Sequence, residues 1–132
     1  MTLSEAQAGL VRREFERCWP WLKAALDRGI PSHDKEHVLD LILSGEAQLW
    51  PGEDSAVVTM VHTYPTGFRE CDGWLAGGTM AGVSKLEKQI AQWAAEIGCN
   101  ISRLQCREGF KRTFASAGYR QAAIVLTKEL NK

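Results

Sequence analysis

The sequence has no excess of either charge. Its 132 residues include 16 lysines and arginines and 16 aspartates and glutamates, so the formal net charge is zero. A neutral chain has no general attraction to the phosphate backbone of nucleic acid, and we expect no specific nucleic-acid partner. The sequence also lacks an apolar run approaching the ~18 residues of a membrane span, and it has no charged-then-apolar leader. We expect neither membrane insertion nor secretion by a signal peptide.

Paired cysteines are also missing. The four cysteines form no C-x-x-C pair and no His/Cys spacing typical of a zinc site; they are Cys18, Cys71, Cys99 and Cys106. Scattered thiols are typical of a reducing cytoplasm, so we expect no disulfides. The chain contains no internal repeat, linker or low-complexity segment, which indicates a single domain over residues 1–132.

Histidines are few, and two of the three lie four residues apart. His33 and His37 would lie on one edge of a helix, a spacing that can hold a metal ion. Neither has an acidic or cysteine partner at a diagnostic spacing, so we expect no bound metal.

The first 31 residues read as helix. Ser4 and Gln7 form a capping box, which predicts a helix beginning near Ser4 and running to about Cys18. Proline is costly beyond the first turn of a helix, so Pro20 predicts either a kink or a second short helix over 20–28. A further helix, capped by Ser32 or Asp34, should end at Gly45.

The remaining chain alternates strand and helix signals. Three strands forming an antiparallel meander are predicted over 47–50, 56–64 and 68–75. Asp72-Gly73 could form a bulge in the third. An amphipathic helix over 84–97, a strand over 100–106, a short helix through Ala117 and a strand over 119–126 should follow. The strands flanking the amphipathic helix should be parallel. We predict an α+β fold, a mixed α/β layer.

This order resembles the GNAT acyltransferase fold. The local match is Phe114-Ala115-Ser116-Ala117-Gly118-Tyr119, which resembles the family's short helix and the aromatic that follows it. The resemblance covers about residues 34–129, so we expect a GNAT-like core over 32–132. It implies an acyl-CoA site at the glycine-rich segment before the amphipathic helix.

A narrower resemblance is to small GNAT-like proteins of tailed bacteriophages. It rests on three short matches: Gly45-Glu46-Ala47-Gln48-Leu49-Trp50, Trp93-Ala94 with Gly98-Cys99, and Arg107-Glu108-Gly109-Phe110-Lys111-Arg112. It implies a protein that acts in the infected host cell or in the virion.

Two departures from the GNAT pattern bear on activity. The glycine-rich segment lacks the family's Arg or Gln signature for the coenzyme pyrophosphate; it comprises Gly77, Gly78, Thr79, Met80, Ala81 and Gly82. It can be a phosphate cradle or a turn joining strand to helix. The family's usual proton-donating Tyr is matched by Phe114, which has no proton to give. Losing such a donor costs about 10²–10⁴ in rate.

Three side chains are candidate catalytic groups if the protein is an enzyme. Glu70 and Asp72 are two residues apart on a strand, so both can face the same side. In a GNAT enzyme a carboxylate in this region can deprotonate an amine. His62 is a second candidate base. For all three, the alternative is a solvated or hydrogen-bonded surface group.

Aromatic and basic residues suggest protein contacts. Trp19 and Trp21 flank Pro20 and should not both point inward on a continuous helix, so either could anchor a partner or pack on the sheet. Arg107 and Arg112 belong to a basic group in the last third that could contact an acidic partner or remain solvated.

Two functions therefore stay open. The first is a non-catalytic, GNAT-like phage protein that needs no cofactor and acts in a virion or its assembly, through self-association or a phage structural protein. The alternative is an acetyl-CoA-dependent N-acyltransferase acting on a small amine or a protein amino group. Phe114 and the missing pyrophosphate signature favour the first.

Overall fold

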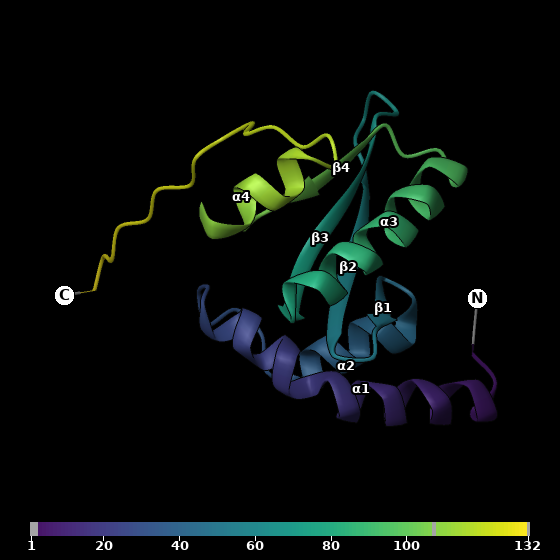
Figure 1. Ribbon diagram of the computed structural model, residues 1–132. Coiled ribbons are helices and arrows are strands. Elements are labelled where there is room, and N and C mark those ends of the chain that lie inside the picture. Colours follow the sequence, from purple (N-terminus) through teal and green to yellow (C-terminus); the bar gives the residue numbers. More distant parts are fainter. Residues whose placement is uncertain (1–2, 107, 132) are drawn as a thin grey trace.

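A computed structural model describes residues 3–106 and 108–131 of the chain (Figure 1). Its helices and strands follow in the order α1 (Glu5–Asp27), α2 (Lys35–Ser44), β1 (Ala47–Pro51), β2 (Ser55–Thr63), β3 (Arg69–Gly78), α3 (Met80–Glu96), β4 (Ile101–Leu104) and α4 (Glu108–Ala115). The mixed α+β fold predicted from the sequence is confirmed.

The strands form one sheet in the order β1-β2-β3-β4. β1, β2 and β3 are antiparallel neighbours, so the predicted meander is confirmed. β4 pairs parallel to β3, as expected for two strands joined through α3. α1 and α2 cover one face of the sheet, and α3 and α4 lie on the other (Figure 1).

The β2–β3 ladder contains one irregularity. Val58 pairs with Leu75 and the next residue, Thr59, pairs with Gly73, so Trp74 is an extra residue on β3. The bulge lies one residue beyond the predicted Asp72-Gly73 position. It coincides with the end of the β3–β4 ladder, whose last pair joins Gly73 to Leu104. A bulge bends its strand, so this position changes the course of β3 where β4 leaves it.

α1 is one helix of 23 residues that runs through Pro20. Of the two alternatives predicted at this proline, a separate helix over 20–28 is wrong. Pro20 is exposed, so the carbonyl of Glu16, which loses its helical partner, lies on the side open to water. Burial of Phe15, Cys18 and Leu22 on the other side holds both halves of the helix against the sheet.

The two tryptophans beside Pro20 are both partly buried against the core under α1. This corrects the expectation that a continuous helix would turn one of them away. Residues two apart on a helix differ by ~200° in direction, so they flank the stripe formed by Cys18 and Leu22 on opposite sides. The large indole rings reach the core from both flanks.

α3 begins at Met80, four residues earlier than predicted. The side chain of Thr79 accepts a hydrogen bond from the backbone N–H of Gly82 at 3.1 Å and so caps the helix. The glycines of this segment concealed the helix start, because Gly is a poor helix former. Val83, Leu86, Ile90 and Ala94 form the buried face of α3 against the sheet.

The predicted final strand over 119–126 is absent from the described part of the chain. Residues 120–131 form neither helix nor strand and are exposed. They lead away from the domain beyond α4 (Figure 1). High β-propensity produces a strand only where a neighbouring edge supplies hydrogen bonds, and this segment does not lie along such an edge.

All four cysteines are free thiols. Among the described helices, none combines the length and the apolar character that crossing a lipid bilayer requires.

Candidate functional site

A cavity among the described residues lies where β3 and β4 separate. It has a volume of about 880 Å³. β3 residues Gly73–Ala76 line one side and the chain over 104–106 lines the other. The cavity reaches both faces of the sheet, since its wall includes the C-terminal part of α1 and also Val83, Glu87 and Ile90 of α3. A small molecule seated here would be accessible from both faces.

The predicted coenzyme-binding segment occupies three different structural positions. Gly77 and Gly78 end β3, Thr79 caps α3, and Met80, Ala81 and Gly82 form the first turn of the helix. Close packing accounts for its glycines. A Cβ at Gly77 would collide with the backbone carbonyl of Trp21, and one at Gly82 would collide with the Ser55 hydroxyl. Gly78 has φ of 105°, which favours glycine.

A second hollow of about 550 Å³ borders the start of α3. Gly78, Met80, Glu108, Gly109 and Phe110 line it. The N-terminus of α3 favours an anion there, because helix dipoles place positive potential at that end. The carboxylate of Glu108 opposes an anion in the same hollow. The first turn of α3 also gives the Gly82 N–H to Thr79 and not to a ligand.

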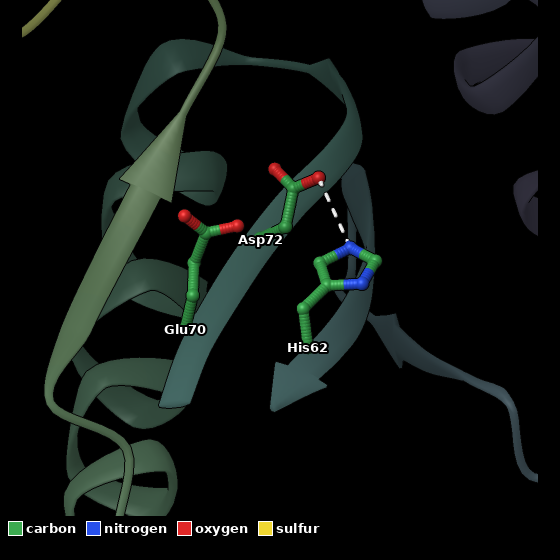
Figure 2. Close-up of side chains that lie close together, drawn as sticks. All are labelled: His62, Glu70 and Asp72. Atoms are coloured by element: carbon green, nitrogen blue, oxygen red, sulfur yellow. Dashed lines mark ion pairs between the residues drawn. The ribbon is translucent and has the colours of Figure 1, made fainter. Parts of the chain in front are cut away.

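The three candidate catalytic groups meet on the sheet face that carries α1, beyond the part of that face that α1 covers. His62 comes from β2, and Glu70 and Asp72 come from β3; Figure 2 shows the three side chains converging. His62 Nε2 lies 3.8 Å from Asp72 Oδ2. The cluster does not line the cavity itself, but Gly73, which follows Asp72 directly, does.

The electrostatics of the cluster are set by burial and by Arg103. Burial raises the pKa of the Asp72 carboxyl, and Glu70 adds to this, whereas Arg103 and His62 oppose it. The Glu70 side chain is only 7% exposed and lies 4.0 Å from Arg103 Nη1. The hydroxyl of Tyr64 donates a hydrogen bond to Glu70 Oε2 at 3.3 Å. A carboxylate whose pKa is raised is a stronger base than an ordinary aspartate.

The same cluster also has the donor atoms of a metal site. One ligand atom from each of His62, Glu70 and Asp72 lies within 4.8 Å of the others. His33 and His37, the pair considered from the sequence, are used differently. The His33 ring packs edge-on against Trp74, and His37 completes the capping box of α2 with Asp34.

Tyr119, which was not among the residues predicted from the sequence, lines the cavity on the α3 face. The hydroxyl of Tyr119 donates to Glu87 Oε2 at 3.1 Å and lies 2.7 Å from Ser102 Oγ. Glu87 is 9% exposed. Burial raises the pKa of Tyr119 to about 12, so its hydroxyl stays protonated at neutral pH. The signal was present: Tyr119 is the second aromatic of the Phe114–Tyr119 motif, and the two rings pack 5.7 Å apart.

The predicted contact residues do not form one surface. Trp19 packs 5.5 Å from Phe15, and Trp21 has the Arg17 guanidinium 5.9 Å from its ring, so both indoles have partners within the domain. Arg112 is exposed on α4. Arg107 lies outside the described residues.

Known proteins resemble this chain in structure but not detectably in sequence. No family model matches the sequence, and no curated protein sequence matches it either. An aminoglycoside acetyltransferase from an uncultured soil metagenomic sample, solved with sisomicin, superposes with a TM-score of 0.61 at 13% identity, over 98% of this chain and 93% of that one.

Two acetyltransferases from eukaryotes are also similar. A Trypanosoma brucei acetyltransferase gives a TM-score of 0.59 at 11% identity, over 73% of this chain and 78% of its own. Glucosamine-6-phosphate N-acetyltransferase from Arabidopsis thaliana gives 0.52 at 12% identity, over 59% of this chain and 58% of its own. With its helices, meander and parallel β3–β4 pair, this chain has the fold of the GNAT acetyltransferases.

Proposed function

We propose that this protein is an acyl-CoA-dependent N-acyltransferase acting on a small amine. The observation that carries the proposal is the cavity between β3 and β4, which opens to both faces of the sheet. A thioester can enter such a passage from the α3 face and an amine from the face that carries Glu70 and Asp72. The aminoglycoside acetyltransferase that shares the fold over nearly the whole chain supports an amine acceptor.

The residues divide the proton chemistry between the two faces. Asp72 or Glu70 accepts a proton from the acceptor ammonium, directly or through His62, which lies 3.8 Å from Asp72. The free amine then forms the new amide bond at the thioester carbonyl, and the carbon–sulfur bond breaks. Bound acyl-CoA supplies the activated acyl group. The Tyr119 hydroxyl gives its proton to the departing thiolate, a role that Phe114 cannot perform. The hydroxyl is restored, through solvent, by the second proton that the amine nitrogen loses as the amide forms.

The non-catalytic phage-protein function is the second candidate. Phe114 at the family's proton-donor position and the missing pyrophosphate signature support it. So does the Glu108 carboxylate beside the start of α3, which weakens anion binding there. In that case the glycines of 77–82 serve packing, and the cavity has no coenzyme to hold.

A thermal-shift titration with coenzyme A and acetyl-CoA separates the two candidates. A ligand at 100 times its Kd adds about 2.7 kcal/mol of stability, which gives a clear rise in Tm. We expect such a rise, and release of free thiol when acetyl-CoA is mixed with a panel of amines that includes sisomicin. Absence of any shift at millimolar coenzyme would exclude the acyltransferase.

A matched pair of variants locates the binding site. Met80→Asp places a negative side chain in the first turn of α3, on an exposed residue that lines the hollow, and should abolish the shift. Glu108→Gln removes the opposing charge from the same hollow and should strengthen binding. Unchanged coenzyme binding in both variants would show that the hollow beside α3 does not hold the coenzyme phosphates.

A further inference from the structure

Apolar side chains form much of the cavity wall on the sheet face that carries α1. Leu26 at the end of α1, Ile30 in the loop that follows and Trp74 of β3 all line the cavity. Ile30 is 67% exposed, so it has apolar surface left for a ligand to cover. A wall of apolar and aromatic side chains with a few polar groups is typical of sites for small organic ligands.

The bulge in β3 places Trp74 in this wall. Trp74 and Leu75 are neighbours in sequence, and yet both pack on the core under α1, because the extra residue interrupts the alternation of the strand. The His33 ring packs edge-on against the Trp74 indole, with 4.7 Å between the ring centroids. His33 Nδ1 in turn lies 2.8 Å from Ser32 Oγ. The His33 and Trp74 rings therefore form a fixed aromatic corner beside the cavity.

An acidic group lies next to this aromatic corner on the same strand face. Asp72 and Trp74 are two residues apart on β3, and side chains at this spacing lie ~7 Å apart on one face. Gly73, between them, lines the cavity where β3 and β4 separate. A ligand whose ammonium group meets Asp72 therefore has its remaining atoms beside Trp74.

Arg28 disfavours a ligand that carries several positive charges. Its guanidinium donates a hydrogen bond to the Ala76 carbonyl at 3.0 Å, which holds it at the cavity wall. Among the described residues of 25–33 that line the cavity, none is acidic. A second ammonium group would meet this positive charge and the apolar wall, and both contacts are unfavourable. The wall therefore suits one ammonium group joined to an apolar body.

We propose that the cavity takes as its acceptor a monoamine in which a short carbon chain joins the primary amine to an aromatic ring. Trp74 selects the ring, which packs beside Leu26 and Ile30, and Asp72 receives the ammonium group. This proposal rests on the proposed acyl transfer and narrows its acceptor. Polyamines are poor ligands of the same site, because Arg28 opposes their additional charges.

Calorimetric titration with phenethylamine, ethylamine and spermidine, each with and without coenzyme A, tests the site. Phenethylamine and ethylamine share the ammonium group and differ by the ring, whose burial should lower the Kd about tenfold or more. We expect phenethylamine to bind the most tightly of the three. Equal Kd values for phenethylamine and ethylamine, tighter binding of spermidine, or no binding of phenethylamine under either condition would overturn the proposal.

Thiol release from acetyl-CoA with the same amines separates this proposal from acyl transfer itself. We expect the highest kcat/KM with phenethylamine. Tight binding of phenethylamine without thiol release from any amine supports the aromatic amine site and excludes acyl transfer. Thiol release at an equal or higher kcat/KM with ethylamine or spermidine supports acyl transfer and overturns the aromatic acceptor.

A matched pair of tryptophan variants locates the ring. Trp74→Leu keeps an apolar side chain and removes the aromatic one, so it should raise the Kd for phenethylamine about 2- to 10-fold and leave that for ethylamine unchanged. Trp93→Leu makes the same change at a half-buried tryptophan of α3 that packs on Trp50, and it should alter neither Kd. Equal effects of the two variants would mean that Trp74 does not contact the ring.

Arg28→Gln tests the preference for a single charge. Arg28 is exposed, so the variant should fold even if Trp74→Leu does not. Loss of the positive charge should lower the Kd for spermidine by a larger factor than the Kd for phenethylamine. The same ratio of the two Kd values in the variant and the natural protein would show that Arg28 does not exclude polyamines.

Discussion

The hydroxyl of Tyr119 donates a hydrogen bond to the carboxylate of Glu87 across 3.1 Å, which joins the chain after α4 to the buried face of α3. A tyrosine hydroxyl has one proton, so Ser102, 2.7 Å from the same oxygen, acts as the donor in the second bond. These two bonds fix the hydroxyl in the wall of the cavity. Burial keeps this hydroxyl protonated at neutral pH, and delivery of its proton to a leaving group requires the bond to Glu87 to break.

Replacing Tyr119 by Phe should remove that delivery. We expect kcat for acetyl transfer to fall by about 10²–10⁴, the usual loss for a positioned acid, with little change in the KM for acetyl-CoA. Steady-state assays of thiol release give both kcat and the KM for acetyl-CoA. The double variant Tyr119→Phe, Phe114→Tyr returns a hydroxyl to the family's usual position and should recover part of kcat. Full activity in Tyr119→Phe alone would assign the proton to another group.

Asp72 should make stability depend on pH in a specific direction. Burial raises its pKa in the folded state above the ordinary value of 3.8, so the folded protein binds this proton more tightly than the unfolded chain. The stabilisation that protonated Asp72 gives the folded state is fully present below pH 3.8. It is lost as the pH rises through the raised pKa of the folded state. Asp72→Asn keeps a neutral side chain, so its stability relative to the natural protein should increase from acid toward neutral pH.

Urea unfolding of both proteins across that pH range provides the measurement. Asp27→Asn is a suitable control, because Asp27 lies on the exposed end of α1 and pairs only with Lys23 among the contacts described. If Asp72→Asn tracks the natural protein at every pH, burial does not perturb this carboxyl.

Gly77 should tolerate no side chain. A Cβ at this position would meet the backbone of Trp21, which cannot move without displacing α1. Gly77→Ala should therefore cost about 1–3 kcal/mol, the range for overpacking. Gly9→Ala is the matched control: a Cβ there meets no atom within 4 Å, and it should stabilise α1 by about 0.5–1 kcal/mol. Chemical denaturation measures both, and equal effects would mean that α1 does not pack on Gly77.

Replacing Ser55 by alanine should increase the stability of the protein. Its hydroxyl is fully buried and has no hydrogen-bond partner among the described residues. An unsatisfied buried group costs about 1–3 kcal/mol, so Ser55→Ala should raise the free energy of unfolding by about 1 kcal/mol. Ser102→Ala removes a bonded hydroxyl and should lower it by a similar amount. A loss of stability in Ser55→Ala would reveal a partner for that hydroxyl.

Local signals in the sequence predicted most of the secondary structure. Ser4 and Asp34 form the capping boxes of α1 and α2, and Gly45 ends α2 with φ of 84°. These features depend on residues three or four positions apart, so they can be read directly from the chain. The same reasoning misplaced the start of α3. Gly82 is a residue type typical of loops, but Thr79 caps the helix and Gly82 lies in its first turn.

Pro20 and the chain after Gly118 show where local reasoning failed. Proline predicts a break, but burial of Phe15 and Leu22 on either side of it keeps α1 whole. The apolar residues 122–126 predict a strand, but a strand needs an edge that the described chain does not bring to it. In both cases contacts distant in sequence decide the outcome.

The sequence by itself determined most of the helices and strands, the meander, and the pair Glu70 and Asp72 on one strand face. Only the tertiary structure decided that β3 and β4 separate after Gly73, and that Tyr119 meets Glu87 from 32 positions away in the chain. The reason is physical: hydrogen bonds between near neighbours follow from local residue order, whereas a cavity and its polar wall arise from strand register and helix packing.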